Sequence, residues 1–276
     1  MKELREFYEK RGRIRKTHSD RSYDTLTHDL LVEKNISTGN IALDLGCGDG
    51  YYLKNLIDKF NMVIGIDISR SYIKQAKKES QHNNVYLIVA DACKIPIRDD
   101  TLDFILCSET IEHLTKPHET ISEIRRTLHI EGKMLMTTPN RLEPTRILLY
   151  SFTNILSKIF GLSSATYIKL SILLIHNKLL RQATQTEKLS LKYSTPDHFH
   201  CFSAKKLTGL CTQIGLTPLR IDYSMHHQII SPIAYLTNRF PQLMILCFKI
   251  GKIIPKETAT VFALICTKID QESCYR

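Results

Sequence analysis

Short apolar runs alternate with helix-length stretches over the first half of the chain. The runs are nearly continuous in apolar character rather than alternating, which indicates strands buried on both faces. The five runs are Ile41–Leu45, Met62–Ile66, Val85–Ala90, Phe104–Cys107 and Lys133–Thr137. Helices are expected between them at about Tyr51–Phe60, Arg70–Ser80 and His118–Leu128. The alternation predicts an α/β fold, with a mostly parallel sheet covered by helices on both sides.

The pattern changes after residue 140. Two stretches, 146–160 and 167–180, place apolar residues at helical spacing among Lys, Arg and His. A second apolar and basic helical stretch covers about 229–254. We therefore expect a helical lid insertion over 141–197 and a further helical insertion at about 229–254.

Strand and helix signals resume around these insertions. Ser203–Ile214 reads as a helix that starts at an N-cap serine and is ended by Gly215, and Pro218–Tyr223 reads as a strand. Thr260–Ile269 is rich in β-branched and aromatic residues and predicts a last strand. The expected organisation is an N-terminal helical segment and core in 1–140, with the rest of the same α/β domain in 198–276.

Composition and charge narrow the class of protein. The 276 residues are 43% hydrophobic and carry a formal net charge of +10, which favours contact with an anionic partner or surface, or serves only solubility. None of the eight cysteines forms a C-x-x-C pair, so no metal site or disulfide framework is expected. The chain has no secretory signal and no run of ~18 apolar residues. We expect a cytoplasmic protein, either free or peripheral at the inner face of a membrane.

A glycine-rich turn follows the first predicted strand. Leu43-Asp44-Leu45-Gly46-Cys47-Gly48-Asp49-Gly50 lets the backbone approach a ligand at the carboxyl edge of the sheet. Tyr51 stands where a dinucleotide fingerprint needs its third glycine, which disfavours an NAD-dependent oxidoreductase. Asp44 would repel a pyrophosphate but suits a cation, and Asp67 ends the next strand, where an acid accepts hydrogen bonds from ribose hydroxyls. The inferred ligand is an unphosphorylated nucleoside with a positive group, a description that fits S-adenosylmethionine (SAM).

Five ordered motifs carry a resemblance to a known family. They are L-D-L-G-C-G-D-G at 43–50, G-I-D-I-S at 65–69, A-D-A-C-K-I-P-I at 90–97, F-I-L-C-S-E-T-I-E-H-L at 104–114 and E-G-K-M-L-M-T-T-P-N at 131–140. Residues 40–139 resemble the core of class I SAM-dependent methyltransferases, in the group that includes the ubiquinone and menaquinone methyltransferases. The resemblance implies a Rossmann-like seven-stranded sheet, mostly parallel with a reversed last strand.

The resemblance also implies a set of SAM-binding residues. Gly46, Cys47, Gly48 and Gly50 would form the loop around the methionine part of SAM, with Asp44 organising that loop or meeting the ammonium. Asp67 would hold the ribose, Ile68 would border the adenine, and Asp91 with Ala92 would meet the adenine amino group. Ser108 would line the methyl-transfer end, and Tyr23 would contact SAM from an N-terminal segment folded over the pocket. Asp91 has an alternative role as a turn or cap residue after its strand.

Three histidines are candidates for a catalytic base. His113 follows the fourth strand and lies near the expected methyl group, although it is equally a capping or packing residue. His198 and His200 come just before the Ser203 helix, in a stretch that closes over the sheet edge in similar enzymes. No third ligand accompanies this pair, so a metal is not expected. Methyl transfer needs a base only where the acceptor must lose a proton.

The acceptor is the open question. The two apolar and basic insertions would form its lid, and they suit either a long apolar substrate or an anionic membrane. A small-molecule or lipid-like acceptor, such as a polyprenyl quinone precursor, is the leading expectation. The alternatives are an RNA or protein methyltransferase, and a SAM-fold protein that binds a partner without catalysis. Nucleic acid is disfavoured because the basic residues are spread out and no N/D-P-P-Y-type motif follows the fourth strand.

Overall fold

A computed structural model of the chain describes residues 9, 23–140, 200–224, 259 and 261–270. The chain divides into two units, and every helix and strand described lies in the first, which is formed by 1–140, 196–225 and 261–276. The second unit consists of 141–195 and 226–260. The helices expected in both insertions therefore lie outside the described residues.

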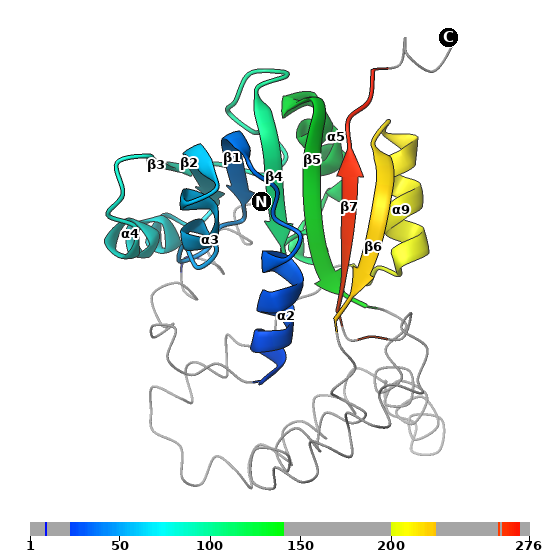
Figure 1. The fold of residues 1–276 in the computed structure, drawn as a ribbon, viewed down its shortest axis with the longest axis horizontal. Coiled ribbons are helices and arrows are strands. Elements are labelled where there is room, and N and C mark those ends of the chain that lie inside the picture. Colours follow the sequence, from blue (N-terminus) through cyan, green and yellow to red (C-terminus); the bar gives the residue numbers. More distant parts are fainter. Residues whose placement is uncertain (1–8, 10–22, 141–199, 225–258, 260, 271–276) are drawn as a thin grey trace, which may run out of the picture. The chain divides into compact units, whose positions relative to one another are not determined.

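Seven strands of the first unit form a single sheet (Figure 1). They are β1 (Gly39–Leu45), β2 (Phe60–Asp67), β3 (Val85–Val89), β4 (Leu102–Ser108), β5 (Leu128–Pro139), β6 (Thr217–Tyr223) and β7 (Val261–Thr267). Their order across the sheet is β3-β2-β1-β4-β5-β7-β6. All pairs from β3 to β5 are parallel, whereas β7 runs antiparallel to both β5 and β6. The expected Rossmann-like sheet with a reversed last strand is confirmed.

Helices cover both faces of this sheet (Figure 1). They are α2 (Tyr23–Glu33), α3 (Leu53–Ile57), α4 (Arg70–Glu79), the 3-10 turn η1 (Ile111–His113), α5 (Pro117–Thr127) and α9 (Ala204–Gln213). α5 and α9 bury their apolar residues against one face, and α2, α3 and α4 pack on the other. Among the described residues no helix is long and apolar enough to span a membrane.

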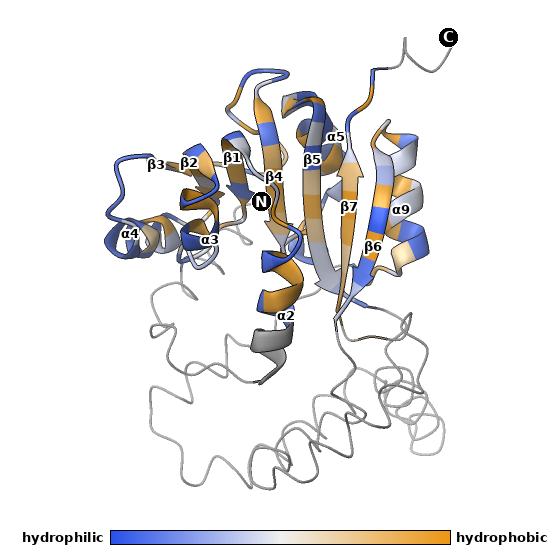
Figure 2. Cartoon of the chain, viewed as in Figure 1, coloured by the Kyte–Doolittle hydropathy of each residue, from blue (hydrophilic) through white to orange (hydrophobic). Residues whose placement is uncertain are grey.

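The central strands are apolar on both sides, as their continuous runs predicted. In β4, Phe104 and Leu106 face the α2–α3 side, while Ile105 and Cys107 face α5 and α9, and all four are fully buried. Figure 2 shows β4 and β7 largely in orange, whereas β6 at the edge of the sheet carries blue segments. The side chains on each face of the sheet belong to a separate hydrophobic cluster, so the sheet lies between two core layers.

Two predicted boundaries were wrong. The helix expected over 51–60 is limited to Leu53–Ile57, because Phe60 is already extended, pairs with Gly39 and buries its ring. The fifth strand starts at Leu128 rather than at Lys133, because Leu128 pairs with Leu102 of β4. In both places burial in the sheet overrides the local helical or loop pattern.

The predicted start and end of the 203–214 helix are confirmed. The Ser203 side chain accepts a hydrogen bond from the Lys206 backbone N–H at 3.3 Å, which is the geometry of an N-cap. Gly215 follows the helix with a φ of +88°, a left-handed conformation that stops helices and favours glycine.

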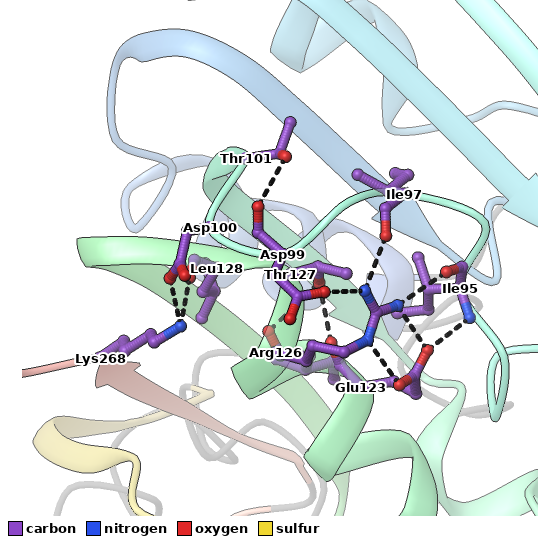
Figure 3. A network of polar contacts seen from close by, with 11 residues as sticks. Ile95, Ile97, Asp99, Asp100, Thr101, Glu123, Arg126, Thr127, Leu128 and Lys268 are labelled. Carbon is purple, nitrogen blue, oxygen red and sulfur yellow. Dashed lines mark hydrogen bonds and ion pairs between the residues drawn. The ribbon is translucent and has the colours of Figure 1, made fainter.

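A polar network fixes the connection between β3 and β4 to α5 (Figure 3). The Arg126 guanidinium donates to both carboxylate oxygens of Glu123, at 2.7 and 2.8 Å, and to Asp99 at 2.7 Å. It also donates to the backbone carbonyls of Ile95 and Ile97, at 2.9 and 2.8 Å. Because one rigid fork reaches two separate carbonyls and two acids, it locks the loop after β3 onto the helix.

Candidate functional site

The glycine turn lies at the carboxyl end of β1 and folds over the end of β2. The backbone N–H groups of Gly46 and Cys47 both donate to the Ile66 carbonyl, at 2.7 and 3.0 Å. Gly46 has a φ of +80°, and a Cβ built there would lie 2.4 Å from Thr110 Oγ1. A Cβ at Gly48, by contrast, meets nothing within 4 Å, so this part of the turn borders open space. Gly46 is required by packing, whereas Gly48 leaves room for a ligand.

Asp67 ties this turn to the start of α4. Its Oδ2 accepts from the Gly48 N–H at 3.0 Å, and its Oδ1 accepts from the Ser69 N–H at 2.8 Å. Burial raises the pKa of Asp67 to about 6, although the two N–H donors pull it down. Each carboxylate oxygen retains a second lone pair, so the side chain can also accept from ribose hydroxyls.

Asp44 lies in β1 directly behind the turn and has a buried oxygen without a partner. Its side chain is 2% exposed, and Oδ2 makes no hydrogen bond within the described part of the chain. Burial, and then the neighbouring carboxylates of Asp67 and Asp49, raise the pKa of Asp44 to about 8. Three acids therefore share a mostly buried region, where an added positive group would relieve both the desolvation and the mutual repulsion.

Glu9 lies at the same edge of the sheet. Glu9 caps the first turn of α4 by accepting from the N–H groups of Arg70 and Ser71, at 2.6 and 3.2 Å. This places a fourth carboxylate beside Asp67, whose pKa it raises. The N-terminal segment was expected to fold over the pocket through Tyr23, which is the first residue of α2 but whose side chain lies outside what the structure describes.

The residues assigned to the adenine end lie at neighbouring strand ends. The Ala90 N–H donates to the Asp67 carbonyl at 3.1 Å, which joins the carboxyl ends of β2 and β3. Ile68 is partly exposed beside Asp67, and Ala92 is buried next to Asp91. The Asp91 Oδ1 accepts from the Cys93 N–H at 3.0 Å, so this acid does organise a local turn. Asp91 also lies close to the end of β2, where Asp67 stands, so contact of Asp91 with the adenine amino group remains a proposal.

Ser108 ends β4 and belongs to a polar cluster that sequence reasoning missed. Its Oγ lies 3.0 Å from Thr137 Oγ1 and 3.4 Å from His28 Nε2, and His28 Nε2 lies 2.9 Å from Thr137 Oγ1. Tyr52, just after the glycine turn, places its hydroxyl 3.0 Å from His28 Nδ1. The only sequence signal was a polar His28-Asp29 pair in a segment that continues as apolar Leu30–Val32.

Two of the three predicted catalytic histidines, His113 and His200, lie at or beside η1. His113 Nε2 lies 3.8 Å from the buried Glu112 carboxylate, whose Oε2 accepts from Thr138 Oγ1 at 3.0 Å. The His200 N–H donates to the Glu112 carbonyl at 3.2 Å, and its ring Nε2 is buried with no hydrogen-bond partner among the described residues. His198 lies outside the described residues. The structure thus brings two of the three candidates together, both beside Glu112.

The described cysteines are free thiols, and most of them are buried. Of the cysteines described, Cys47, Cys107, Cys211 and Cys266 are buried free thiols. Burial raises the pKa of the Cys47 thiol well above its ordinary value, so this side chain is an uncharged part of the turn. No group of three or more potential metal ligands occurs in the portion of the chain that the structure describes.

Comparison with known proteins identifies the class that this geometry belongs to. Residues 43–136 match the family model described as a methyltransferase domain. This match covers the glycine turn, the acids at the ends of β1 and β2, and the first five strands of the sheet, in agreement with the resemblance to SAM-dependent methyltransferases that the motifs predicted.

Among its relatives is a ubiquinone biosynthesis O-methyltransferase from Glaesserella parasuis, 32% identical over 110 residues, which are 37% of this chain and 47% of that protein. A probable SAM-dependent methyltransferase from Mycolicibacterium smegmatis is 29% identical over 104 residues, covering 38% of this chain and 40% of that protein. A SAM-dependent methyltransferase structure from Thermotoga maritima aligns over 96% of this chain and 99% of that chain, with a TM-score of 0.58 and 14% identity. The chain spans less than half the length of the curated relatives that it matches.

Proposed function

We propose that the protein binds SAM at the carboxyl edge of β1 and β2 and transfers its methyl group to a small-molecule or lipid-like acceptor. The observation that carries this proposal is the buried Asp44 Oδ2, which has no hydrogen-bond partner among the residues described, behind a glycine turn that is open at Gly48. A cationic ligand suits this site, whereas a pyrophosphate would be repelled by the acids.

The chain's own residues would divide the work of binding. Asp67 would hold ribose hydroxyls while keeping the Gly48 and Ser69 N–H groups in place. Asp44 would meet the ammonium, directly or through a water, and Asp91 the adenine amino group. SAM would supply an electrophilic methyl group on a sulfonium. Rate enhancement then rests on positioning and on the exclusion of water from the strand ends.

The proposed methyl acceptor is based on the names of relatives and on the composition of the two insertions. Relatives named as a ubiquinone biosynthesis O-methyltransferase and a malonyl-[acyl-carrier protein] O-methyltransferase support transfer to oxygen. A polyprenyl quinone precursor is one such acceptor, and the apolar and basic insertions at 141–197 and about 229–254 are its proposed lid. Contact of those insertions with an anionic membrane is part of the same proposal.

Binding is tested by calorimetry with SAM and with S-adenosylhomocysteine on the purified chain. Asp67→Ala should abolish measurable SAM binding, because it removes the carboxylate from the ribose end. Since this carboxylate also holds two loop N–H groups, Asp67→Asn serves as a second variant that retains an acceptor, and circular dichroism verifies folding. Asp58→Ala, an exposed acid at the end of α3, is the matched control and should bind like the wild type. Unchanged affinity in Asp67→Ala would place the ribose elsewhere.

Transfer is tested by incubating the protein with methyl-labelled SAM and fractionated cell extract. Label should enter a small-molecule or lipid fraction. Label in RNA or protein instead would favour the alternative methyltransferase class. SAM binding with no transfer to any fraction would favour a non-enzymatic binding protein, since a shared fold does not fix the reaction.

A further inference from the structure

The first backbone N–H groups of α4 have partners from two distant parts of the chain. The N-cap Ser69 accepts from the Tyr72 N–H through its own side chain, at 3.3 Å. The N–H groups of Arg70 and Ser71 donate instead to the Glu9 carboxylate, at 2.6 and 3.2 Å. A helix cannot satisfy its first N–H groups within itself. Glu9 therefore occupies the two that the N-cap serine does not reach.

Glu9 is held at this place by its backbone as well as by its side chain. The Ser71 hydroxyl donates to the Glu9 carbonyl at 2.9 Å, and it also lies 2.9 Å from Ser69 Oγ. Glu9 precedes Arg70 by 61 residues, so the local pattern of neither segment indicates the contact. The two attachments fix the carboxylate at the positive end of the α4 dipole.

Glu9 lies beside the proposed ribose end of the site. Asp67 ends β2 directly before this helix and accepts from the Ser69 N–H at 2.8 Å. Burial raises the pKa of Asp67, and the nearby Glu9 charge adds to this rise. The two carboxylates therefore share the N–H groups of one turn. A ligand at this edge is indicated independently by the buried Asp44 Oδ2, which has no hydrogen-bond partner in the described part of the chain.

Without Glu9, the start of α4 would suit a phosphate group. Open N–H groups and the helix dipole together attract phosphate to helix N-termini. In nucleotide-binding α/β folds the acid after the second strand holds ribose hydroxyls, and a nearby arginine accommodates a phosphate on the 2′ oxygen. Here Arg70 follows Asp67 by 3 residues and has an exposed side chain. The elements of a ribose-phosphate site are thus present, but a carboxylate of the protein fills it.

We propose that Glu9 is a specificity-determining residue that keeps nucleosides with a phosphate on the ribose out of the SAM site. This inference rests on the proposed SAM binding and deepens it. A phosphate on the 2′ or 3′ oxygen of a ribose held by Asp67 would compete with Glu9 for the same N–H groups. Its charge would also meet two carboxylates. SAM has unmodified hydroxyls at both positions, so selection works by repulsion of the wrong ligand.

The excluded class consists of adenosine nucleotides that are phosphorylated on the 2′ or 3′ oxygen. They share adenine and ribose with SAM, so contacts of Asp91 and Asp67 with these parts would not discriminate against them. A phosphate on the 5′ oxygen would lie instead at the glycine turn, with Asp44 behind it. Two separate acids would thus exclude phosphate from two positions of the nucleoside, Asp44 from the 5′ side and Glu9 from the 2′ and 3′ side.

The selectivity of the wild type is tested by displacement of S-adenosylhomocysteine, followed by calorimetry in a buffer without phosphate or sulfate. The competitors are adenosine and its 2′-, 3′- and 5′-monophosphates. Adenosine should compete at least about 10-fold better than each monophosphate, because like charges disfavour binding at this edge. A 2′- or 3′-monophosphate that competes as well as adenosine would overturn the proposal.

The role of Glu9 is tested with two variants. Glu9→Gln removes the charge but keeps an amide oxygen that can accept from the two N–H groups. It should raise the affinity for the 2′- or the 3′-monophosphate by about 10-fold, while the affinities for adenosine and S-adenosylhomocysteine stay within about threefold. Glu9→Ala opens both N–H groups and should raise the affinity further. The matched control is Glu79→Gln, an exposed acid at the other end of α4, which should leave every affinity unchanged.

The 5′-monophosphate separates a local effect from a general change in charge. Its affinity should stay as low in the Glu9 variants as in the wild type, because Asp44 is unchanged. An equal gain for all three monophosphates would show that Glu9 acts only through the net charge of this edge. A uniform loss of affinity for every ligand, in variants that circular dichroism shows to be folded, would make Glu9 a structural anchor alone. Either result would refute the specificity role.

The outcomes separate this inference from the proposed function. A wild type that binds SAM and S-adenosylhomocysteine, with Glu9 variants of unchanged selectivity, overturns the inference and leaves SAM binding standing. A wild type that binds neither of the two overturns the proposed function itself.

Discussion

Asp44 is a buried acid that lowers the stability of the folded protein when it is ionised, and the same charge would attract a cationic ligand. It is a carboxyl group in the middle of a parallel sheet, with Ala42 and Leu43 before it and Leu45 after it fully buried. A position of this kind ordinarily takes Val, Ile or Leu. An acid placed there costs stability whenever it is ionised without a partner, and a cationic ligand offsets that cost.

The first prediction concerns Asp44→Asn in the ligand-free protein. The folded pKa of Asp44 is about 8, against an ordinary 3.8. The unfolded chain therefore loses this proton near pH 4, while the folded chain keeps it, so this group lowers stability progressively as pH rises from 4 to 8. Asp44→Asn should match the wild type near pH 4 and exceed its melting temperature by about 2–4 °C or more at pH 8.

Thermal unfolding by circular dichroism at both pH values measures this difference. The exposed Asp58→Asn is the control and should show no pH-dependent gain. The Asn variant should simultaneously bind SAM more weakly. A variant that is equally destabilised at both pH values would show that the Asp44 charge is satisfied inside the folded protein.

At the scale of elements, the loop after β3 links the proposed SAM-binding edge of the sheet to α5. This loop carries Asp91 and Ala92 at the proposed adenine end and is clamped to α5 by Arg126 (Figure 3). The Glu123 carboxylate completes the clamp by accepting from the Ile95 N–H at 2.9 Å. The position of the loop therefore depends on a helix that itself has no contact with the glycine turn in the interactions described.

The second prediction concerns this clamp. Arg126→Lys keeps the charge but loses the planar fork, so at most part of the five hydrogen bonds can be remade. The guanidinium is 31% exposed, which limits the effect. We expect a loss of about 1–2 kcal/mol in unfolding free energy, read from urea titration. Arg98→Lys, an exposed arginine of the same loop, should change it by less than about 0.5 kcal/mol.

For the whole molecule, net charge and local charge have opposite signs. The chain carries +10, which by itself repels a cationic ligand. The acids Asp44, Asp49, Asp67 and Glu9 nevertheless lie close enough together at one sheet edge to raise the pKa values of Asp44 and Asp67. Local burial, rather than overall composition, therefore decides which ligand this edge accepts.

The third prediction follows from the titration of these acids. Asp67 and Asp44 release their protons at about pH 6 and 8 in the ligand-free protein, and a cation binds best when they are ionised. SAM affinity should therefore rise by about 10-fold between pH 5.5 and 7.5. Calorimetry in matched buffers checks this, and Asp44→Asn should show a shallower rise. An affinity independent of pH would mean that neither acid changes its protonation on binding.

The sheet and the acids at its strand ends were predictable for a physical reason. Strands buried on both faces must be continuously apolar, and acids such as Asp67 that interrupt them at a strand end are visible in the chain. The motif from Leu43 to Gly50 predicts a turn with left-handed residues, because glycine adopts positive φ angles more readily than other residues. The ends of elements were less predictable, since Phe60 and Leu128 join strands only through their pairing partners.

The sequence by itself determined the fold class, the glycine turn and the two acids for which we propose a cationic nucleoside as ligand, because these depend on local pattern and on the periodicity of burial. Only the tertiary structure decided that the Asp44 Oδ2 has no hydrogen-bond partner among the described residues and that His28, 80 residues before Ser108, lies beside the end of β4. Neither is visible in a local pattern, because both depend on contacts between elements far apart in the chain. Packing of α2 against the sheet brings His28 and Asp29 into contact with Tyr52 and with the ends of β4 and β5.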